Sequence, residues 1–223
     1  MRQSWMFSFR NSSDHEDEDL KIIVIRPGAT SYDYERCIQG DLSVRLTEAG
    51  RGEVRLLAEE LKTEDIRYIY SSPNEPALET AEIISRTLNV PRKRLEGLRN
   101  QNQGLWQGMR VDDLRRLQPR IYRQWAESPL SVCPPEGESL FYVTQRVRDA
   151  ISSITRRHRG GTVGLVVGEP TASLVLCCLK HEEIHHLWDH IGNHGCWEEV
   201  DVVSENNMRD DFQKRFPKTL FSR

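Results

Sequence analysis

The sequence predicts an α/β protein, a three-layer α/β/α sandwich around a mostly parallel sheet. Continuous apolar runs alternate with amphipathic helical segments along the 223 residues, and that order is typical of parallel sheets covered on both faces. The composition, with 37% hydrophobic and 29% charged residues, is that of a globular protein, and no apolar run approaches the length of a membrane span. A chain of this size buries enough surface to fold without disulfides or metals.

The first half of the chain predicts two strand–helix units. Residues 21–25 form a β-branched run that stops at Arg26, as a buried strand ending in a loop does. Residues 47–62 have apolar side chains at helical spacing and begin with a threonine that can cap a helix. Residues 66–70 predict a second strand, and a second helix with one apolar face extends to Leu88.

The second half resumes this order after an interruption. Residues 99–142 are rich in Arg, Gln, Pro and Trp, and they predict helices and loops inserted like a lid over one end of the sheet. Beyond them we expect a helix over 139–157, a buried strand over 161–167, a helix over 171–179 and a last strand within 193–203. Residues 21–203 thus predict one α/β domain.

Both ends of the sequence predict tails outside this domain. Residues 1–20 become acidic from Asp14 onward and contain neither the apolar region nor the cleavage site of a signal peptide, so we expect a mobile tail. Residues 204–223 predict a polar C-terminal tail.

Net charge and cysteine content limit the partners and the compartment. The net charge of −3 gives no overall attraction to nucleic acid or to an anionic membrane, so any anion must bind locally. Five cysteines form no CxxC pair, and their odd number argues against a complete disulfide framework. We therefore expect a soluble cytoplasmic protein with no cofactor and no resident metal, and the sequence does not indicate an oligomeric state.

The loops after three predicted strands form the candidate site. In open α/β sheets, ligands bind beyond the carboxyl ends of the strands. That rule places the site in residues 26–30, 71–74 and 168–171.

Short motifs in these loops and beyond them occur in a characteristic order. The order begins with Arg26-Pro27-Gly28-Ala29-Thr30, Gln39-Gly40 and Leu46-Thr47 with Gly50. It continues with Ser71-Ser72-Pro73, Thr80-Ala81-Glu82-Ile83-Ile84, Gly104-Leu105-Trp106-Gln107-Gly108 and Pro135-Glu136-Gly137-Glu138-Ser139. With these motifs the chain resembles the histidine phosphatase superfamily, which includes the cofactor-dependent phosphoglycerate mutases, over residues 21–203. The resemblance implies a phosphoglycerate mutase-like fold.

The resemblance also implies a phosphate-transfer site whose residues have changed. The family attacks phosphate with a histidine in an Arg-His-Gly motif, and that position is Pro27, which has no nucleophilic atom. The family's second arginine corresponds to Pro76, its general-acid glutamate to Asn100 or a neighbour, and its second histidine to Glu169. Of the five positions, only Arg26 keeps the family's residue.

These replacements predict a binding site in place of a catalytic one. One arginine facing one carboxylate is nearly neutral, and a carboxylate ~4 Å from a phosphate opposes it by about 4 kcal/mol at an effective dielectric of 20. We expect a catalytically inactive binding or regulatory module for an anionic small molecule or a protein partner. The expected ligand-binding residues are Arg26, Gly28, Thr30, Arg36 and Glu169.

The replacements also suit structural roles. Pro170 fits the first turn of the helix that follows it, which places Glu169 at the positive end of the helix dipole. Pro76 fits a helix start with Asn74 as its cap. Former catalytic positions would then hold structural residues.

Three alternative interpretations involve histidines. Residual phosphatase or phosphomutase activity would need a substitute nucleophile, and His194 lies in a segment that approaches the site in the family. A metal site is the second, because residues 181–185 match the zinc pattern HExxH, which needs both histidines on one helical face. Trp188 and Ile191 stand where the longer pattern has a glycine and a third histidine. Adventitious metal binding by His181, His185, His186 and His190 is a further interpretation.

A basic segment lies at residues 86–123. It holds ten Lys or Arg against three acidic residues, Glu96, Asp112 and Asp113. Such a segment predicts either a face for an anion or nucleic acid, or a solvated helix surface. We favour the solvated surface, so nucleic acid is not an expected partner.

Overall fold

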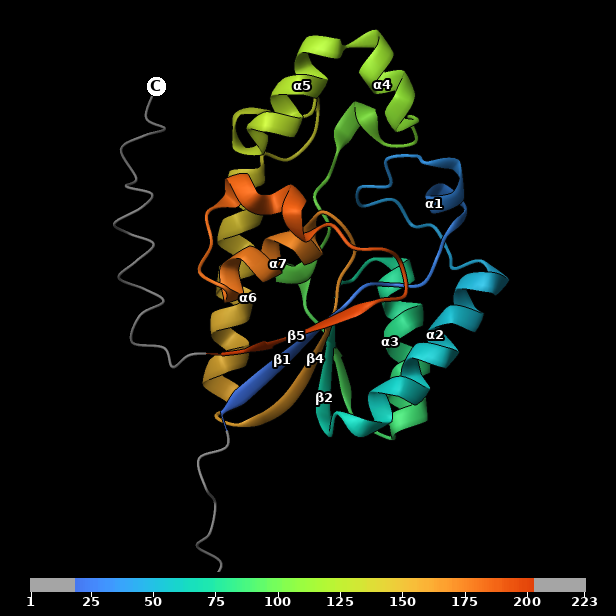
Figure 1. The fold of residues 1–223 in the computed structure, drawn as a ribbon, viewed down its shortest axis with the longest axis vertical. Coiled ribbons are helices and arrows are strands. Elements are labelled where there is room, and N and C mark those ends of the chain that lie inside the picture. Colours follow the sequence, from blue (N-terminus) through green and yellow to red (C-terminus); the bar gives the residue numbers. More distant parts are fainter. Residues whose placement is uncertain (1–18, 203–223) are drawn as a thin grey trace, which may run out of the picture.

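The computed structural model describes residues 19–202, so the predicted tails lie outside the described residues, apart from residues 19 and 20. Five strands form one sheet in the order β3-β2-β4-β1-β5 (Figure 1). They are β1 (Leu20–Ile25), β2 (Ile66–Ser71), β3 (Arg92–Arg94), β4 (Gly161–Val166) and β5 (Trp197–Asp201). Strands β1 to β4 run parallel, and β5 pairs antiparallel with β1. The mostly parallel sheet predicted from the sequence is confirmed.

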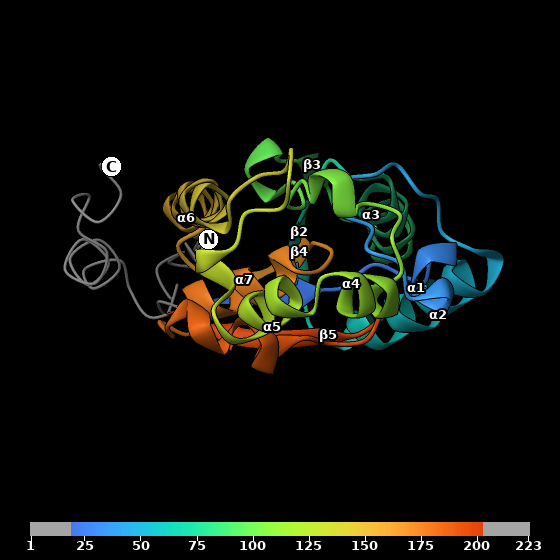
Figure 2. The same ribbon diagram turned by 90° about the horizontal axis from the view of Figure 1, so that it is seen from above.

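Helices cover both faces of this sheet. They are α2 (Glu48–Glu60) and α3 (Glu75–Leu88) on one face, and α6 (Leu140–Arg157) and α7 (Thr171–Leu179) on the other (Figures 1 and 2). Successive side chains of a strand point to opposite faces, so Ile23 and Ile25 pack with α2 and α3, whereas Ile22 and Val24 pack with α6 and α7. Burial on both faces explains why β1 is apolar throughout except at the exposed Lys21. The predicted three-layer sandwich is confirmed.

The start of helix α2 follows from the local sequence. Thr47 precedes α2, and its hydroxyl oxygen accepts a hydrogen bond from the backbone N of Gly50 at 3.0 Å. Helix α2 continues into a short 3₁₀ turn, η1 (Leu61–Thr63), so the helix predicted over 47–62 is present with a tightened last turn.

The segment between β3 and α6 lies beyond the carboxyl ends of the parallel strands, at the top of Figure 1. It contains η3 (Gly104–Trp106), α4 (Val111–Leu117), α5 (Pro119–Glu127) and η4 (Pro129–Ser131). These pieces have a small core of their own, formed by Trp106, Leu114 and Val132 with Ile38. The short elements α1 (Ser31–Glu35) and η2 (Glu96–Leu98) complete this end of the molecule.

Two elements of the structure were not predicted from the sequence. The segment before the last strand is a 3₁₀ helix, η5 (Ile184–His190), in which Ile184 and Leu187 are buried but Ile191, just beyond it, is exposed. All three residues of the edge strand β3 are exposed and basic. The sequence therefore has no apolar pattern there from which a strand could be predicted. Among residues 19–202, no helix is both long and apolar enough to cross a bilayer.

Candidate functional site

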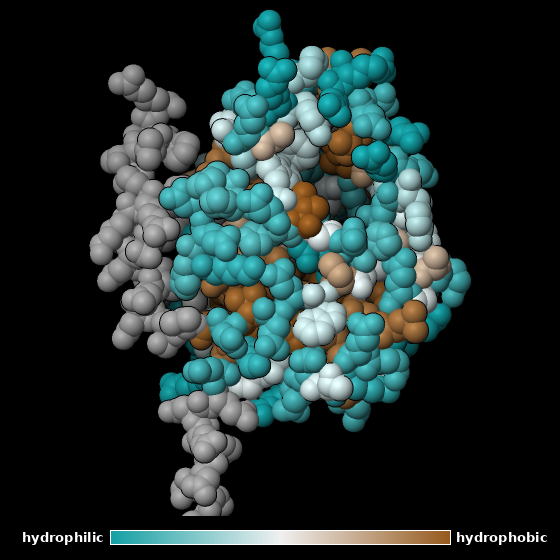
Figure 3. All heavy atoms as spheres, viewed as in Figure 1, coloured by the Kyte–Doolittle hydropathy of each residue, from teal (hydrophilic) through white to brown (hydrophobic). Residues whose placement is uncertain are grey.

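A cavity of about 240 Å³ lies at the carboxyl ends of β1 and β4, where the sequence placed the site. Its floor comes from the loops after these strands and from the start of α3. Trp125 of α5 and Trp188 of η5 form part of its wall, with their rings 4.8 Å apart, and the Trp188 Nε1–H donates to the Trp125 carbonyl at 3.2 Å. On the face drawn in Figure 3, the surface is hollowed between α1 and α4.

Arg26, the first residue after β1, is buried at this cavity with 3% of its surface exposed. Its Nε donates to Glu169 Oε1 at 2.6 Å, its Nη2 donates to the carbonyl of His190, and its Nη1 lies 3.7 Å from the Cys196 sulfur. Burial, the largest single effect, lowers the pKa of the guanidinium, but the Glu169 carboxylate and the Cys196 sulfur together raise it by more, so the net pKa lies above its ordinary value. Every guanidinium nitrogen of Arg26 thus has a partner within the chain.

Glu169 lies in the loop between β4 and α7. Its second carboxylate oxygen accepts from the Ser173 hydroxyl at 2.6 Å and from the Ser173 backbone N at 3.2 Å. The carboxylate therefore interacts with the first turn of α7, at the positive end of that helix, as the sequence predicted. Pro170 is the N-cap residue rather than a member of the first turn, because the helix begins at Thr171.

Pro27, Gly28 and Thr30 continue the loop after Arg26 and also line the cavity. Gly28 is required there, because a Cβ would collide with the Gly50 carbonyl and with Val54. The backbone N and hydroxyl of Thr30 both donate to Asp33 Oδ2 at 2.7 Å, which caps α1. The hydroxyl of Thr30 thus already donates a hydrogen bond to Asp33. Thr30 lines the cavity, but its main role is to cap α1.

Arg36 does not belong to the cavity wall. Its side chain is 71% exposed and pairs with Asp112 at 4.0 Å, after the αL turn that ends α1. The structure therefore does not bring Arg36 together with the other expected ligand-binding residues, because its αL conformation at the end of α1 directs the side chain to solvent.

Pro76 and Asn74 lie at the start of α3, as the sequence predicted, with Pro76 as the second helical residue. The Asn74 side chain does not cap the helix. Its Oδ1 instead accepts from the Ser72 hydroxyl at 2.5 Å and from the Asn100 backbone N at 2.9 Å. Asn74 thereby connects the loop after β2 to the segment that carries Asn100.

Asn100 and Gln103 give the cavity two buried acceptors. Asn100 Nδ2 donates to the Gly40 carbonyl at 3.2 Å, and Gln103 Nε2 donates to Gln101 Oε1 at 2.9 Å. The remaining oxygens, Asn100 Oδ1 and Gln103 Oε1, have no hydrogen-bond partner among the described residues, although both residues are at most 4% exposed. Unpartnered buried acceptors are costly, and both residues line the cavity, so a donor that reached either oxygen would relieve that cost.

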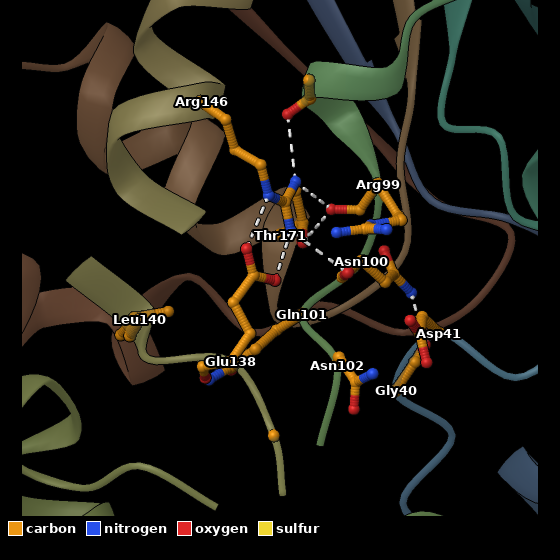
Figure 4. Close-up of polar contacts among 12 residues, drawn as sticks. Gly40, Asp41, Arg99, Asn100, Gln101, Asn102, Glu138, Leu140, Arg146 and Thr171 are labelled. Atoms are coloured by element: carbon orange, nitrogen blue, oxygen red, sulfur yellow. Dashed lines mark hydrogen bonds and ion pairs between the residues drawn. The ribbon is translucent and has the colours of Figure 1, made fainter. Parts of the chain in front are cut away.

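Arg146 of α6 fixes the backbone on which Asn100 stands (Figure 4). Its guanidinium donates to the carbonyls of Gly97 and Asn100, each at 3.1 Å, and to that of Arg99. Glu138 completes the arrangement with two contacts to this guanidinium, at 3.1 and 3.0 Å. This mostly buried ion pair therefore positions the segment 97–100 against the cavity.

His194 lines the cavity close to the loop of Pro27, as the sequence indicated. Its Nδ1 lies 2.8 Å from Glu53 Oε2, an oxygen that also accepts from the Ala29 backbone N at 3.2 Å. The backbone N of the next residue, Gly195, donates to the Pro27 carbonyl at 2.8 Å. The histidine ring is thus oriented by a carboxylate beside the former catalytic loop.

The HExxH segment does not form the predicted zinc motif. Helix α7 ends at Leu179, His181 has a positive φ of 57°, and η5 begins only at Ile184. His181 and His185 therefore do not share one helical face, which that metal site requires. The geometry of this segment therefore does not support the metal-hydrolase interpretation.

The basic segment 86–123 is a charged surface in which several cations have nearby acidic partners. Arg86 and Arg92 pair with Glu82 at 2.5 and 3.7 Å, and Arg116 pairs with Asp113 at 3.1 Å. These pairs fit the solvated helix surface that we favoured.

Four further residues line the cavity without having been predicted as site residues: Asp33, Gln103, Trp125 and Trp188. Gln103 was detectable in principle, because it belongs to a polar run, Asn100–Gln103, next to a recognised motif. The two tryptophans carried no such signal, because aromatic residues at helical spacing are more often core.

An α/β sandwich with a ligand cavity at the carboxyl edge of its parallel strands defines the class of this protein. The family model of the histidine phosphatase superfamily (branch 1) matches residues 22–209, and the chain belongs to this superfamily. Phosphoserine phosphatase 1 of Hydrogenobacter thermophilus is 30% identical over 169 residues, which cover 76% of this chain and 80% of that protein. Phosphoglycerate mutase-like protein 4 of Arabidopsis thaliana is 36% identical over 159 residues, 69% of this chain and 68% of that protein. Among solved structures, Bacillus stearothermophilus YhfR is 30% identical with a TM-score of 0.75, covering 83% of this chain and 92% of that one.

Proposed function

We propose that this chain is a catalytically inactive member of its superfamily that binds a ligand in the strand-end cavity as a binding or regulatory module. The observation that supports this most strongly is the Arg26–Glu169 ion pair. Arg26 is the one residue that the family resemblance retains for phosphate, and its guanidinium is already bound within the chain. Pro27, at the position of the family's nucleophile, offers no atom that could accept a phosphoryl group.

The charges of the cavity also oppose a phosphate monoester. Glu169 and Asp33 line it together with Arg26, so two carboxylates accompany one guanidinium. A carboxylate ~4 Å from an anion costs about 4 kcal/mol at an effective dielectric of 20. The preferred ligand is therefore not a phosphate monoester.

The ligand that fits is a small polar molecule that carries N–H or O–H donors on a partly apolar body. Asn100 Oδ1 and Gln103 Oε1 are buried acceptors without partners in the described chain, and they would receive the donors. Trp125, Trp188 and Ile191 supply apolar wall for the body of the ligand. This chemistry revises the anionic small molecule that the sequence alone suggested.

The cytoplasm is the compartment that we propose. All five cysteines lie within the described residues and none of them forms a disulfide. That state is typical of a reducing compartment.

Residual phosphatase activity is the second candidate, and one specific observation favours it. His194 lines the cavity, and Glu53 holds its ring at 2.8 Å, which is the carboxylate–histidine arrangement that orients a base or nucleophile. Such an activity would depend on His194 and would produce a phosphohistidine at that residue.

Hydrolysis of p-nitrophenyl phosphate across acid to neutral pH tests both candidates. The native protein is compared with the quadruple variant Pro27→His, Pro76→Arg, Asn100→Glu, Glu169→His, and with a control in which Pro27 is changed to Ala instead. We expect turnover only in the variant that contains the new histidine at position 27. Thermal unfolding of all three proteins shows whether each one is folded.

Native turnover that disappears in His194→Asn would overturn the proposal in favour of residual activity. Native turnover that survives this change would refute the inactive assignment as well, and would place the nucleophile elsewhere.

A further inference from the structure

A second cluster of reactive side chains lies where α7 turns into η5. It consists of Cys177 near the end of α7, Glu182 in the turn, and His190 at the end of η5. The Cys177 sulfur, a Glu182 carboxylate oxygen and a His190 ring nitrogen all lie within 4.8 Å of one another. None of the three lines the strand-end cavity, so this cluster is separate from the site described above.

We propose that Cys177, Glu182 and His190 bind one Zn²⁺ ion, with water as the fourth ligand. Thiolate, imidazole and carboxylate are the three ligand types that zinc takes in proteins, at about 2.0–2.3 Å from the metal. Ligand atoms around a tetrahedral ion at those lengths are about 3.3–3.8 Å apart. The present separations allow this geometry after small side-chain rotations.

The fold holds these ligands in place before any metal binds. Cys177 is 1% exposed, and the His190 side chain is 11% exposed. The backbone N of Glu182 donates to the Cys177 carbonyl at 2.9 Å, which fixes the turn between the two. Glu182 itself is 38% exposed and leaves a path by which an ion can enter.

The charges around the cluster also favour a divalent cation. His190 Nε2 and Glu182 Oε2 are 2.6 Å apart and share a hydrogen bond. Zinc would replace that hydrogen bond, bind the neutral imidazole, and displace the Cys177 thiol proton to solvent. The thiolate and the Glu182 carboxylate then balance the two charges of the ion, and the nearby Asp189 adds a further negative charge.

This cluster differs from the HExxH pattern that first drew attention to the segment. Of residues 181–185, only Glu182 takes part, and the other two ligands come from either side of the motif. The His190 carbonyl also accepts a hydrogen bond from Arg26. A metal bound to His190 would therefore also stabilise the backbone whose carbonyl accepts a hydrogen bond from Arg26.

Metal titration of the full, tag-free chain after chelator treatment tests the proposal. Zn²⁺ is added in competition with a chromophoric chelator, and Co²⁺ in a separate titration reports the ligand type by its absorption. We expect one ion per chain, together with the thiolate-to-cobalt charge-transfer band. Cys177→Ser should abolish that band, and Glu182→Gln and His190→Gln should each weaken zinc binding at least tenfold.

Matched variants separate this site from adventitious binding. A His185→Gln, His186→Gln double variant removes two exposed neighbouring histidines, and Cys133→Ser removes an exposed cysteine. Both should retain the cobalt band and one ion per chain. Because Cys177 is buried, Glu182→Gln at the surface keeps the test valid if Cys177→Ser fails to fold. Absence of uptake, or uptake lost only in the double variant, would overturn the proposal.

Discussion

Glu169 contacts Arg26 at 2.6 Å and so connects the loops that follow two neighbouring parallel strands, β4 and β1. The ion pair stands at the edge of the sheet where an α/β protein binds its ligand. It satisfies a buried cation, because the Arg26 side chain is only 4% exposed. The carboxylate of Glu169 also offsets the positive charge with which Arg26 would attract an anion.

Neutralising Glu169 should therefore restore anion binding at Arg26. In Glu169→Gln the guanidinium keeps its place but loses its charged partner, so affinity for inorganic phosphate or vanadate should rise at least tenfold, about 1.4 kcal/mol. Isothermal titration measures the change. Glu53→Gln is the matched control, because Glu53 pairs with His194 rather than with Arg26. Equal anion affinity in native protein and Glu169→Gln would show that the ion pair does not determine selectivity.

Alanine substitution at two glycines should change the free energy of unfolding in opposite directions. Gly28→Ala places a Cβ against the Gly50 carbonyl and Val54, so the free energy of unfolding should fall by about 1–3 kcal/mol. Gly52→Ala lies within α2 with nothing inside 4 Å of its Cβ, and it should stabilise by about 0.5–1 kcal/mol. Urea unfolding of both variants checks the pair. A neutral effect at Gly28 would contradict the close packing of the β1 loop on α2.

The elements that follow from sequence are those with a strong apolar period or a cap. Residues 21–25 and 161–167 are apolar on both faces because helices cover both sides of the sheet, and this pattern predicts a buried strand. Strand β3 could not be predicted, because its three residues are all exposed and basic and its pairing with β2 is a tertiary contact. Likewise, no local sequence pattern reveals the 3₁₀ form of η5, in which Leu187 is buried.

The site was predictable to the extent that it lies at strand ends. Arg26 and Glu169 were placed together from the rule for parallel sheets and from the motif order, and the structure brings them into contact. The direction of a side chain was not predictable, because the αL turn at the end of α1 sends Arg36 to solvent. Gln103 became a cavity residue only through the fold of its loop, where its acceptor is buried.

The Arg146–Glu138 pair should contribute far more to the free energy of unfolding than an exposed ion pair does. Arg146→Met leaves Glu138 mostly buried without its cation, and it also removes the donors to three backbone carbonyls. Loss of one partner of such a pair costs about 3–5 kcal/mol. Arg116→Met, which breaks an exposed pair with Asp113, should cost less than about 1 kcal/mol. Denaturant unfolding of the two variants compares the effects, and similar losses would show that Arg146 does not anchor the segment 97–100.

His158 should make stability depend on pH. Its Nε2 lies 2.9 Å from the Tyr70 hydroxyl, and burial, with a smaller contribution from Arg157, lowers the pKa of the ring from its ordinary 6.5. The unfolded chain therefore binds the proton at a higher pH than the folded chain does. The stability that the neutral ring contributes is present above pH 6.5 and is lost as the pH falls through the lowered pKa. In His158→Gln, which can still hydrogen-bond but does not titrate, the melting temperature should fall less between pH 7 and pH 5. If the melting temperature fell equally with pH in the native protein and in His158→Gln, His158 would not be the source of the pH dependence.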